Sequence, residues 1–155
     1  MPVPEFIASL RARIGHDLLW LPGVTAVVRD AAGRVLLTRR SDTGAWALPS
    51  GIPEPGEQMA RACAREVLEE TGVGVVVERL VGVQTLPPTA YPDGDRCQFV
   101  DHSFACRAVA GRAHVADDES TEVVWCAEAD LPDLGWQTDV VRRAADPHAP
   151  AWFAT

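Results

Sequence analysis

Long apolar runs are missing from this sequence. Arg, Asp or Glu interrupts every apolar stretch well before the roughly 18 consecutive apolar residues that a membrane-spanning helix requires. The beginning of the chain carries Glu5 and also lacks the apolar segment of a secretory signal peptide. We therefore predict a soluble, cytoplasmic protein that makes no contact with a membrane.

Paired metal-ligand motifs are missing as well. The cysteines form no C-x-x-C pair, and the histidines show no matching spacing, which argues against a zinc site. A cytoplasmic address favours reduced thiols, so we expect the cysteines to act as small buried apolar residues. They are Cys63, Cys97, Cys106 and Cys126.

Basic residues are scarce. Lys and Arg number 14 against 22 Asp and Glu, which gives a formal charge of −8 at pH 7. Because such a charge repels a phosphate backbone, we expect no polymeric nucleic acid as a partner. A small phosphorylated ligand remains compatible, since it needs only a local pocket and a divalent cation to reverse the local sign.

The remaining composition fits one globular domain. A length of 155 residues falls within the usual single-domain range of about 100 to 200. A hydrophobic fraction of 47% against 23% charged residues excludes a disordered chain. We predict one domain over residues 1–155, with an N-terminal helical extension over 1–20 and a tail over 147–155.

Hydrophobic periodicity and turn residues predict an alternation of helices and strands. Gly15 is placed to end a first helix, and Gly33 stands at the turn of a hairpin. This order favours an α/β fold in which helices cover a mixed sheet. The expected segments are helix 4–14, strands 24–28 and 34–38, helix 57–71, strands 73–85, 97–108 and 122–126, a surface loop over 86–95 and helix 134–145.

The helix over 57–71 carries three carboxylates on one stripe. On a helical wheel Glu66, Glu69 and Glu70 lie together, beside the apolar face. Like charges four residues apart destabilise a helix by a few tenths of a kcal/mol, whereas a hard cation turns the repulsion into coordination. The stripe therefore predicts a metal site, with a solvated acidic face as the alternative. The expected apolar face consists of Ala60, Ala64, Val67, Leu68 and Thr71.

Residues 51–73, GIPEPGEQMARACAREVLEETGV, resemble the Nudix box, G-x5-E-x7-R-E-U-x-E-E-x-G-U, in which U is aliphatic. The resemblance implies the family's α/β/α sandwich with a mixed, partly antiparallel sheet. It also implies hydrolysis of a pyrophosphate bond that depends on Mg²⁺ or Mn²⁺. The matched positions are Gly51, Glu57, Arg65, Glu66, Val67, Glu69, Glu70, Gly72 and Val73.

The same resemblance implies roles for individual residues. Glu66, Glu69 and Glu70 correspond to the family's metal-binding, catalytic carboxylates. Glu57 and Arg65 correspond to an ion pair that braces the loop against the helix.

A main-chain carbonyl just before the box often completes the metal site in this family. In this sequence that position is Ser50, where glycine is commoner. If the backbone there has a positive φ, serine is strained by about 1 kcal/mol or more.

Two positions are candidates for the general base. Some members of the family use a box glutamate such as Glu66, and others use an acid on a later loop. The segment 117–122, DDESTE, resembles that loop and makes Glu119 the second candidate. The alternative role for Glu119 is that of a solvated turn residue.

Candidate substrate-binding residues lie outside the box. Arg39 and Arg40 precede a loop that contains Trp46, and such groups hold a phosphate and stack on a base. The alternative role for Trp46 is core packing. Pro88 stands where ADP-ribose pyrophosphatases tend to have proline, and Tyr91 stands where enzymes of dinucleoside polyphosphates tend to have tyrosine.

We therefore expect a pyrophosphohydrolase for a nucleoside diphosphate linked to another moiety, of the ADP-ribose type. The products would be a nucleoside monophosphate and a phosphorylated second product. The alternatives are a hydrolase of nucleoside or deoxynucleoside triphosphates or of dinucleoside polyphosphates, and a sensor module that binds a nucleotide without cleaving it. The resemblance is also compatible with a homodimer, which is common among relatives of the ADP-ribose type.

Overall fold

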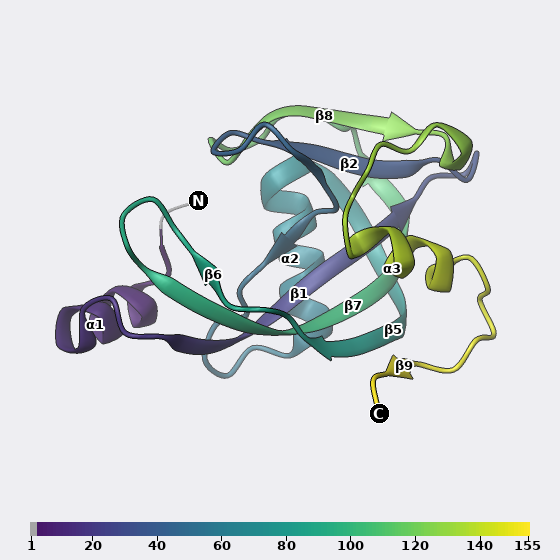
Figure 1. The fold of residues 1–155 in the computed structure, drawn as a ribbon. Helices are drawn as coiled ribbons and strands as arrows, with labels where there is room; N and C mark the ends of the chain where they lie inside the picture. Colours follow the sequence, from purple (N-terminus) through teal and green to yellow (C-terminus); the bar gives the residue numbers. More distant parts are fainter. Residues whose placement is uncertain (1–2) are drawn as a thin grey trace.

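The computed structural model describes residues 3–155. The predicted helices and strands occur in the predicted order. The helices are α1 (Glu5–Ile14), α2 (Met59–Thr71), the short 3-10 helix η1 (Glu128–Asp130) and α3 (Gln137–Ala144) (Figure 1). The strands are β1 (Leu19–Arg29), β2 (Val35–Arg40), β3 (Trp46–Ala47), β4 (Ser50–Gly51), β5 (Val73–Thr85), β6 (Thr89–Ala90), β7 (Arg96–Gly111), β8 (Ser120–Cys126) and β9 (Trp152–Phe153). Of these, η1, β3, β4, β6 and β9 are additional to the predicted elements. The first strand begins at Leu19, within the predicted N-terminal helical extension over 1–20.

All strands belong to one mixed sheet. Its central path runs β3-β2-β1-β7-β5-β9, while β4, β6 and β8 pair with β1, β7 and β2. The long strands β1 and β7 are parallel, whereas β5 and β7 are antiparallel. The predicted mixed, partly antiparallel sheet is therefore confirmed.

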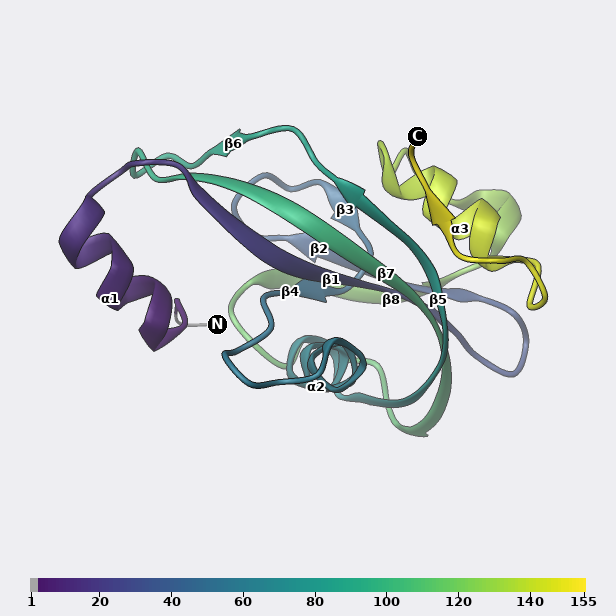
Figure 2. The same ribbon diagram turned by 90° about the horizontal axis from the view of Figure 1, so that it is seen from below.

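Two helices cover opposite sides of this sheet. In Figure 2, α2 lies on one side of β1 and β7, and α3 lies on the other. Alternate residues of β1 consequently enter different cores, since side chains of a strand point to opposite faces in turn. Val24, Ala26 and Val28 pack beneath α2, whereas Val27 packs beneath α3. The α/β/α sandwich predicted from the sequence is confirmed.

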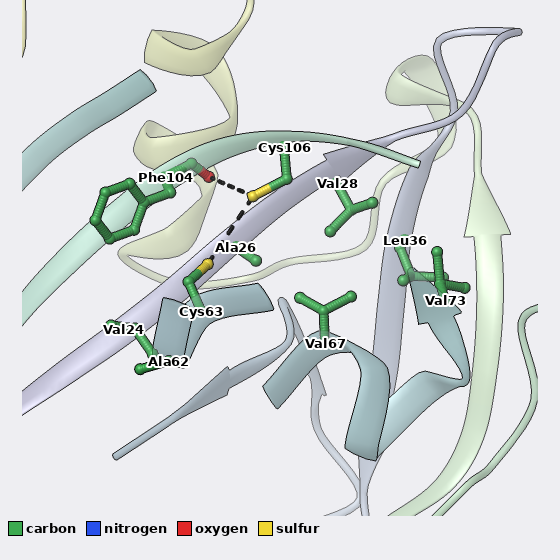
Figure 3. Close-up of a cluster of buried hydrophobic side chains, with 10 residues drawn as sticks. All are labelled: Val24, Ala26, Val28, Leu36, Ala62, Cys63, Val67, Val73, Phe104 and Cys106. Atoms are coloured by element: carbon green, nitrogen blue, oxygen red, sulfur yellow. Dashed lines mark hydrogen bonds between the residues drawn. The ribbon is translucent and has the colours of Figure 1, made fainter. Parts of the chain in front are cut away.

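The core beneath α2 contains two of the cysteines. Cys63 on α2 faces Cys106 on β7, with their Sγ atoms 3.9 Å apart (Figure 3). Both thiols are buried and reduced, and all the cysteines are free. Cys126 is only half-buried, so the expectation of buried thiols is confirmed for Cys63, Cys97 and Cys106 and is wrong for Cys126.

The ends of α2 are set by local backbone chemistry. The helix begins at Met59, later than the predicted 57, after Gln58 in an extended conformation. It ends at Thr71 and is capped by Gly72, whose φ of 70° is left-handed and whose N–H donates to the Leu68 carbonyl. Glycine reaches that conformation without a steric penalty, so the predicted C-cap is confirmed.

Two segments predicted without regular structure join the sheet. The loop over 86–95 contains β6, which pairs with the start of β7. The tail over 147–155 contains β9, which pairs in parallel with β5. Trp152 of β9 also stacks on the Arg143 guanidinium, 3.7 Å from the ring centre, and this contact attaches the tail to α3.

The N-terminal helix α1 packs at the end of the sheet opposite α3, beside the loop between β6 and β7 (Figure 1). Its buried Ile7 contacts a cluster with Leu19, Leu21 and Cys97. Arg11 donates to the carbonyl of Arg96 at 2.8 Å and so ties the helix to β7. Among the described residues, no helix is long and apolar enough to cross a membrane.

Candidate active site

Two of the three box glutamates on α2 are buried beneath the helix. The exposed fractions of Glu66 and Glu70 are only 1% and 5%, and the other buried residues of α2 are Ala62, Cys63, Val67 and Thr71. Val67 and Thr71 are therefore buried as predicted, whereas Ala60 is exposed. The prediction that these carboxylates lie beside the apolar face is wrong. The buried face is centred on them, and Leu68, expected inside, is 52% exposed. Burying a carboxylate is unfavourable unless a partner compensates, so the position indicates a function.

The electrostatics of the two carboxylates reflect this burial. Desolvation, together with the charges of Glu66, Glu119 and Asp117, raises the pKa of Glu70 to about 9. Desolvation also raises the pKa of Glu66 to about 7, while the nearby Arg65 opposes that shift. Glu66, Glu70, Asp117 and Glu119 therefore form an acidic cluster, which we call the carboxylate cluster.

Arg65 joins the loop before α2 to the helix itself. Its guanidinium donates to both carboxylate oxygens of Glu57, each at 2.9 Å. It also donates to Glu66 at 2.9 Å and to the more exposed Glu69 at 3.1 Å. Bidentate pairs of this kind fix both position and orientation. The contacts hold the loop over 52–57 against α2 and place Glu69 on the same guanidinium nitrogen as Glu66.

The segment before α2 must approach Glu66 closely. A side chain at Gly51 would place its Cβ 2.1 Å from Glu66 Cδ, so only glycine fits between the strand and the carboxylate. The neighbouring Ser50 lies in β4 opposite Thr25, and its backbone N–H donates to the Glu70 carboxylate. Among residues 3–155 only glycines have a positive φ, so Ser50 is free of the strain considered for it.

The loop that carries Asp117 and Glu119 is attached to the end of α2. The N–H of His114 donates to the Thr71 carbonyl at 3.0 Å, and the N–H of Ala116 donates to the Glu70 carbonyl at 3.2 Å. On the other side, Ser41 N–H donates to the Glu119 carbonyl at 2.8 Å. These backbone bonds bring the loop acids beside Glu70, although they are distant from it in sequence.

The carboxylate cluster has the donor atoms that a hard divalent cation prefers. Glu66 Oε2 and Asp117 Oδ2 are buried and lack a hydrogen-bond partner within the described part of the chain. Mg²⁺ and Mn²⁺ bind carboxylate oxygens, so the residues fit such a cation. In residues 3–155 no three acidic, histidine or cysteine side chains already converge on one point. Glu69 would have to turn from Arg65 to join the cluster.

A cavity of about 620 Å³ opens beside the carboxylate cluster. Ser50 and Glu119 line it at the cluster, and Ile7 and Arg11 of α1 line the far end. Its floor comes from the same face of the parallel strands β1 and β7, where Leu21, Gly23 and Thr25 pair with Phe99, Asp101 and Ser103. A volume of a few hundred Å³ is typical of small-molecule sites.

The predicted substrate-binding residues fall into two groups. Arg40 and Tyr91 line the cavity, and Arg40 makes a bidentate pair with Asp42 at its rim. Arg39 and Trp46 do not line it. The Arg39 guanidinium lies 5.8 Å from the Trp46 ring centre and donates to Glu122, while Trp46 packs on the core beneath α3.

Several cavity residues were absent from the sequence prediction. Asp101 is buried on the floor, where desolvation raises its pKa and the hydroxyls of Ser103 and Thr25 lower it. The alternation Cys97, Phe99, Asp101 was a usable signal, because it places an acid on the inward face of a strand. The wall made by α1 required the tertiary structure, as did the position of Asp117, from the predicted loop over 117–122, beside Glu70.

The fold and the site together define a class of enzyme: an α/β/α sandwich that holds buried carboxylates from one helix beside a nucleotide-sized cavity. The NUDIX domain model matches residues 19–148, and the chain therefore belongs to the Nudix hydrolase family, whose members act on pyrophosphate bonds. Membership implies a nucleotide substrate. The matched range excludes α1.

Individual relatives point to different substrates. An ADP-ribose pyrophosphatase from Methanocaldococcus jannaschii is 34% identical over 129 residues, which cover 79% of this chain and 73% of that protein. The human 8-oxo-dGDP phosphatase is 33% identical over 115 residues, 70% of this chain and only 33% of that protein. The crystal structure of an ADP-ribose pyrophosphatase from Streptococcus suis superimposes with a TM-score of 0.67 at 19% identity, covering 84% of this chain and 96% of that one. That last likeness concerns the fold.

Proposed function

We propose that the protein hydrolyses the pyrophosphate bond of a nucleoside diphosphate linked to another moiety, with ADP-ribose as the representative substrate. The products are a nucleoside monophosphate and a phosphorylated second product. The observation that carries this proposal is the carboxylate cluster at one end of a nucleotide-sized cavity. The 34% identity to an ADP-ribose pyrophosphatase supports the substrate class.

The cofactor in this proposal is Mg²⁺ or Mn²⁺, held by Glu66, Glu69, Glu70 and the main chain of Ser50. When bound, such a cation neutralises charge on the pyrophosphate and lowers the pKa of an attacking water. Glu66 and Glu70 would supply fixed oxygen ligands, because both lie on helix α2, Arg65 donates to Glu66 and the Ser50 N–H donates to Glu70.

The general base accepts one proton from the attacking water as its oxygen bonds to phosphorus and the bridging oxygen leaves. We assign this task to Glu119, because it lines the cavity and its charge contributes to the raised pKa of Glu70. Glu66 is the alternative base. A pyrophosphate next to these acids also needs a cationic contact, which Arg40 provides from the cavity wall.

Tyr91 is the candidate for contact with the rest of the substrate. It lines the cavity and packs in the same cluster as Phe99 and Ile52. Aromatic rings of this kind stack on nucleobases. Arg39 and Trp46 lie outside the cavity. We propose that they contact the substrate only if the substrate extends out of the cavity and over β3.

A second candidate function is hydrolysis of nucleoside diphosphates or triphosphates, including oxidised ones. The 33% identity to the human 8-oxo-dGDP phosphatase favours it. Dinucleoside polyphosphates are a further alternative within the same chemistry. A sensor module that binds without hydrolysis has no need of buried carboxylates, which count against it.

Product chromatography on a substrate panel tests the proposal. Wild type, Glu70→Gln and the surface control Glu78→Gln are incubated with Mg²⁺ and ADP-ribose, diadenosine polyphosphates, NADH, CDP-choline, or canonical and oxidised nucleoside triphosphates. We expect wild type and the control to release AMP from ADP-ribose, and Glu70→Gln to be inactive. Cleavage of a triphosphate alone would replace the substrate assignment, and equal activity of Glu70→Gln would contradict the site.

A further inference from the structure

Asp101 is a buried carboxylate on the cavity floor that the proposed chemistry does not use. Its exposed fraction is 3%, and it lines the cavity from β7. Asp101 Oδ1 accepts a hydrogen bond from the Thr25 hydroxyl at 2.6 Å, and Oδ2 accepts one from the Ser103 hydroxyl at 2.5 Å. Each carboxylate oxygen retains a second acceptor site. The two hydroxyls thus fix the orientation of Asp101 and leave it able to accept bonds from a ligand.

Gly23 leaves the space beside this carboxylate open. It is the partner of Asp101 in the parallel pairing of β1 with β7. A Cβ at Gly23 would lie 3.7 Å from Asp101 Oδ1 and 3.4 Å from Phe99 Cδ1. Glycine is not required there for steric reasons, since those separations are ordinary contacts. A side chain at this position would fill the floor between Asp101 and Phe99.

The floor changes in character along β1. Thr25 lies opposite Ser50, next to the carboxylate cluster. Two residues before Thr25 in β1, Gly23 pairs with Asp101. Two residues before Gly23, Leu21 pairs with Phe99. Each step of two residues spans about 6.6 Å along a strand. Along the cavity floor, the end next to the carboxylate cluster is therefore followed by Asp101 as a hydrogen-bond acceptor. An apolar, aromatic end comes last, and Tyr91 and Ile7 complete it.

A nucleotide has the same order of chemical groups: phosphates, a sugar with hydroxyl groups, and a flat base. With its phosphates at Ser50 and its base against Phe99, the sugar falls over Gly23 and beside Asp101. An ionised carboxylate suits the vicinal hydroxyls of ribose, because it accepts one bond at each oxygen. The same role is filled by the acidic residue that binds ribose in dinucleotide-binding folds.

We infer that Asp101 binds the ribose diol and makes the cavity selective for ribonucleotides over 2′-deoxyribonucleotides. Thr25 and Ser103 are its positioning residues. The inference rests on the proposed function, because it takes the phosphate end of the cavity to be the carboxylate cluster. It favours ADP-ribose, which carries ribose diols, over deoxynucleotides such as 8-oxo-dGDP.

Binding of product-like nucleotides tests this inference without hydrolysis. Isothermal titration with AMP and with 2′-deoxy-AMP, in EDTA, gives the ratio of the two dissociation constants. A hydrogen bond to a charged group contributes enough that wild type should bind AMP at least about tenfold more tightly. In Asp101→Asn, which preserves the side-chain volume, we expect the ratio to fall below about threefold.

Two further variants keep the test decisive. Asp139→Asn changes a surface aspartate paired with Arg142 and should retain the wild-type ratio. Gly23→Ala leaves Asp101 unchanged but fills the space for the sugar, so it should weaken binding of both nucleotides about tenfold or more. If Asp101→Asn does not fold, weakening in Gly23→Ala together with a tenfold wild-type ratio supports the inference. A wild-type ratio near one overturns it.

The same preparations are assayed on ADP-ribose with Mg²⁺, which separates the two proposals. Hydrolysis of ADP-ribose without a preference for AMP over 2′-deoxy-AMP leaves the proposed function intact and removes Asp101 from the ribose. A tenfold preference that disappears in Asp101→Asn, without hydrolysis of any member of the panel, supports the ribose site and contradicts the enzymatic proposal.

Discussion

Helices α2 and α3 cover opposite sides of the same sheet but differ in what they bury. Helix α3 buries Val140, Val141 and Ala144, and its one buried polar side chain, Gln137, accepts a hydrogen bond from the Leu48 N–H at 2.8 Å. Helix α2 buries Glu66 and Glu70 on its inward face. Similar architecture therefore supports two kinds of interior. The polar group beneath α3 is satisfied within the protein, whereas Glu66 Oε2 beneath α2 has no hydrogen-bond partner among the described residues.

The difference between the two helices shows that the interior beneath α2 is less favourable for folding than the interior beneath α3. Apolar burial beneath α3 contributes about 25 cal/mol per Å² without an opposing electrostatic penalty. Beneath α2, desolvated like charges oppose folding until their charge is neutralised. Sites that perturb the pKa of buried groups in this way are commonly functional. The predictions that follow compare the two helices, from the largest expected effect to the smallest.

Glu70→Gln should produce the largest change. We expect kcat/KM on ADP-ribose to fall at least a hundredfold, since loss of a metal ligand removes roughly several kcal/mol of transition-state stabilisation. Unfolding by urea in EDTA at pH 8 should show no loss of stability, because Gln is neutral in both states, whereas burial of Glu70 requires a proton that the unfolded chain does not bind at that pH. Val140→Ala on α3 should do the reverse, with near-normal activity and a loss of roughly 2 kcal/mol. Equal loss of stability in both variants would contradict the comparison.

Gly51→Ala tests whether the position of Glu66 matters. The new Cβ would lie 2.1 Å from Glu66 Cδ and must displace that carboxylate. Misplacement of a catalytic group by about 1 Å reduces rates by up to a hundredfold, so we expect kcat to fall about tenfold to a hundredfold. Gly74→Ala, whose Cβ would lie 3.3 Å from the Ala110 Cβ on the sheet, is the matched control. Similar kinetics in both variants would count against the explanation.

The metal-free protein should lose stability as the pH rises. Burial raises the pKa of Glu66 to about 7 and that of Glu70 to about 9, above the ordinary value of 4.5. Protonated carboxyls are therefore favoured in the folded state, and their contribution is lost as the pH rises from about 5 through 9. Urea unfolding in EDTA should show a decrease of several kcal/mol between pH 5.5 and 8.5, since each pH unit over which one extra proton is bound in the folded state contributes about 1.4 kcal/mol. A flat or rising profile would refute the assignment, and Glu66→Gln/Glu70→Gln should abolish the slope.

The smallest effect concerns α3 and the tail. Arg143→Gln removes the cation–π contact with Trp152 and should lower the free energy of unfolding by about 0.5 to 1 kcal/mol. Arg142→Gln removes an exposed pair with Asp139 and should have no measurable effect. Neither change should alter activity. If Arg143→Gln loses no more stability than Arg142→Gln, the contact with Trp152 does not stabilise the attachment of the tail.

Much of the fold was predictable because local signals agree with the final structure. The hairpin turn at Gly33 and the C-cap at Gly72 are local, as is the periodicity of α1. The strands β6 and β9 were missed because each has only two residues and exists through pairing with a distant strand. Such pairing leaves no pattern in a short Pro-rich segment.

The site was predictable only in part. The box glutamates follow from a motif within one helix, yet their burial contradicted the helical wheel. Simple amphipathic reasoning assigns charged residues to the exposed face, whereas the fold places Glu66 and Glu70 inward and leaves Leu68 outside. Asp117 and the wall formed by α1 depend on contacts between distant segments, which one sequence does not display.

Thermal unfolding with added Mg²⁺ tests the central claim most directly. Wild type, Glu70→Gln and Glu78→Gln are compared at pH 8 in EDTA and in millimolar Mg²⁺. The account predicts that Mg²⁺ raises the midpoint of wild type and Glu78→Gln by mass action and leaves Glu70→Gln nearly unchanged. An absence of any shift in wild type, or an equal shift in Glu70→Gln, would contradict the claim that the carboxylates beneath α2 are retained to bind a divalent cation.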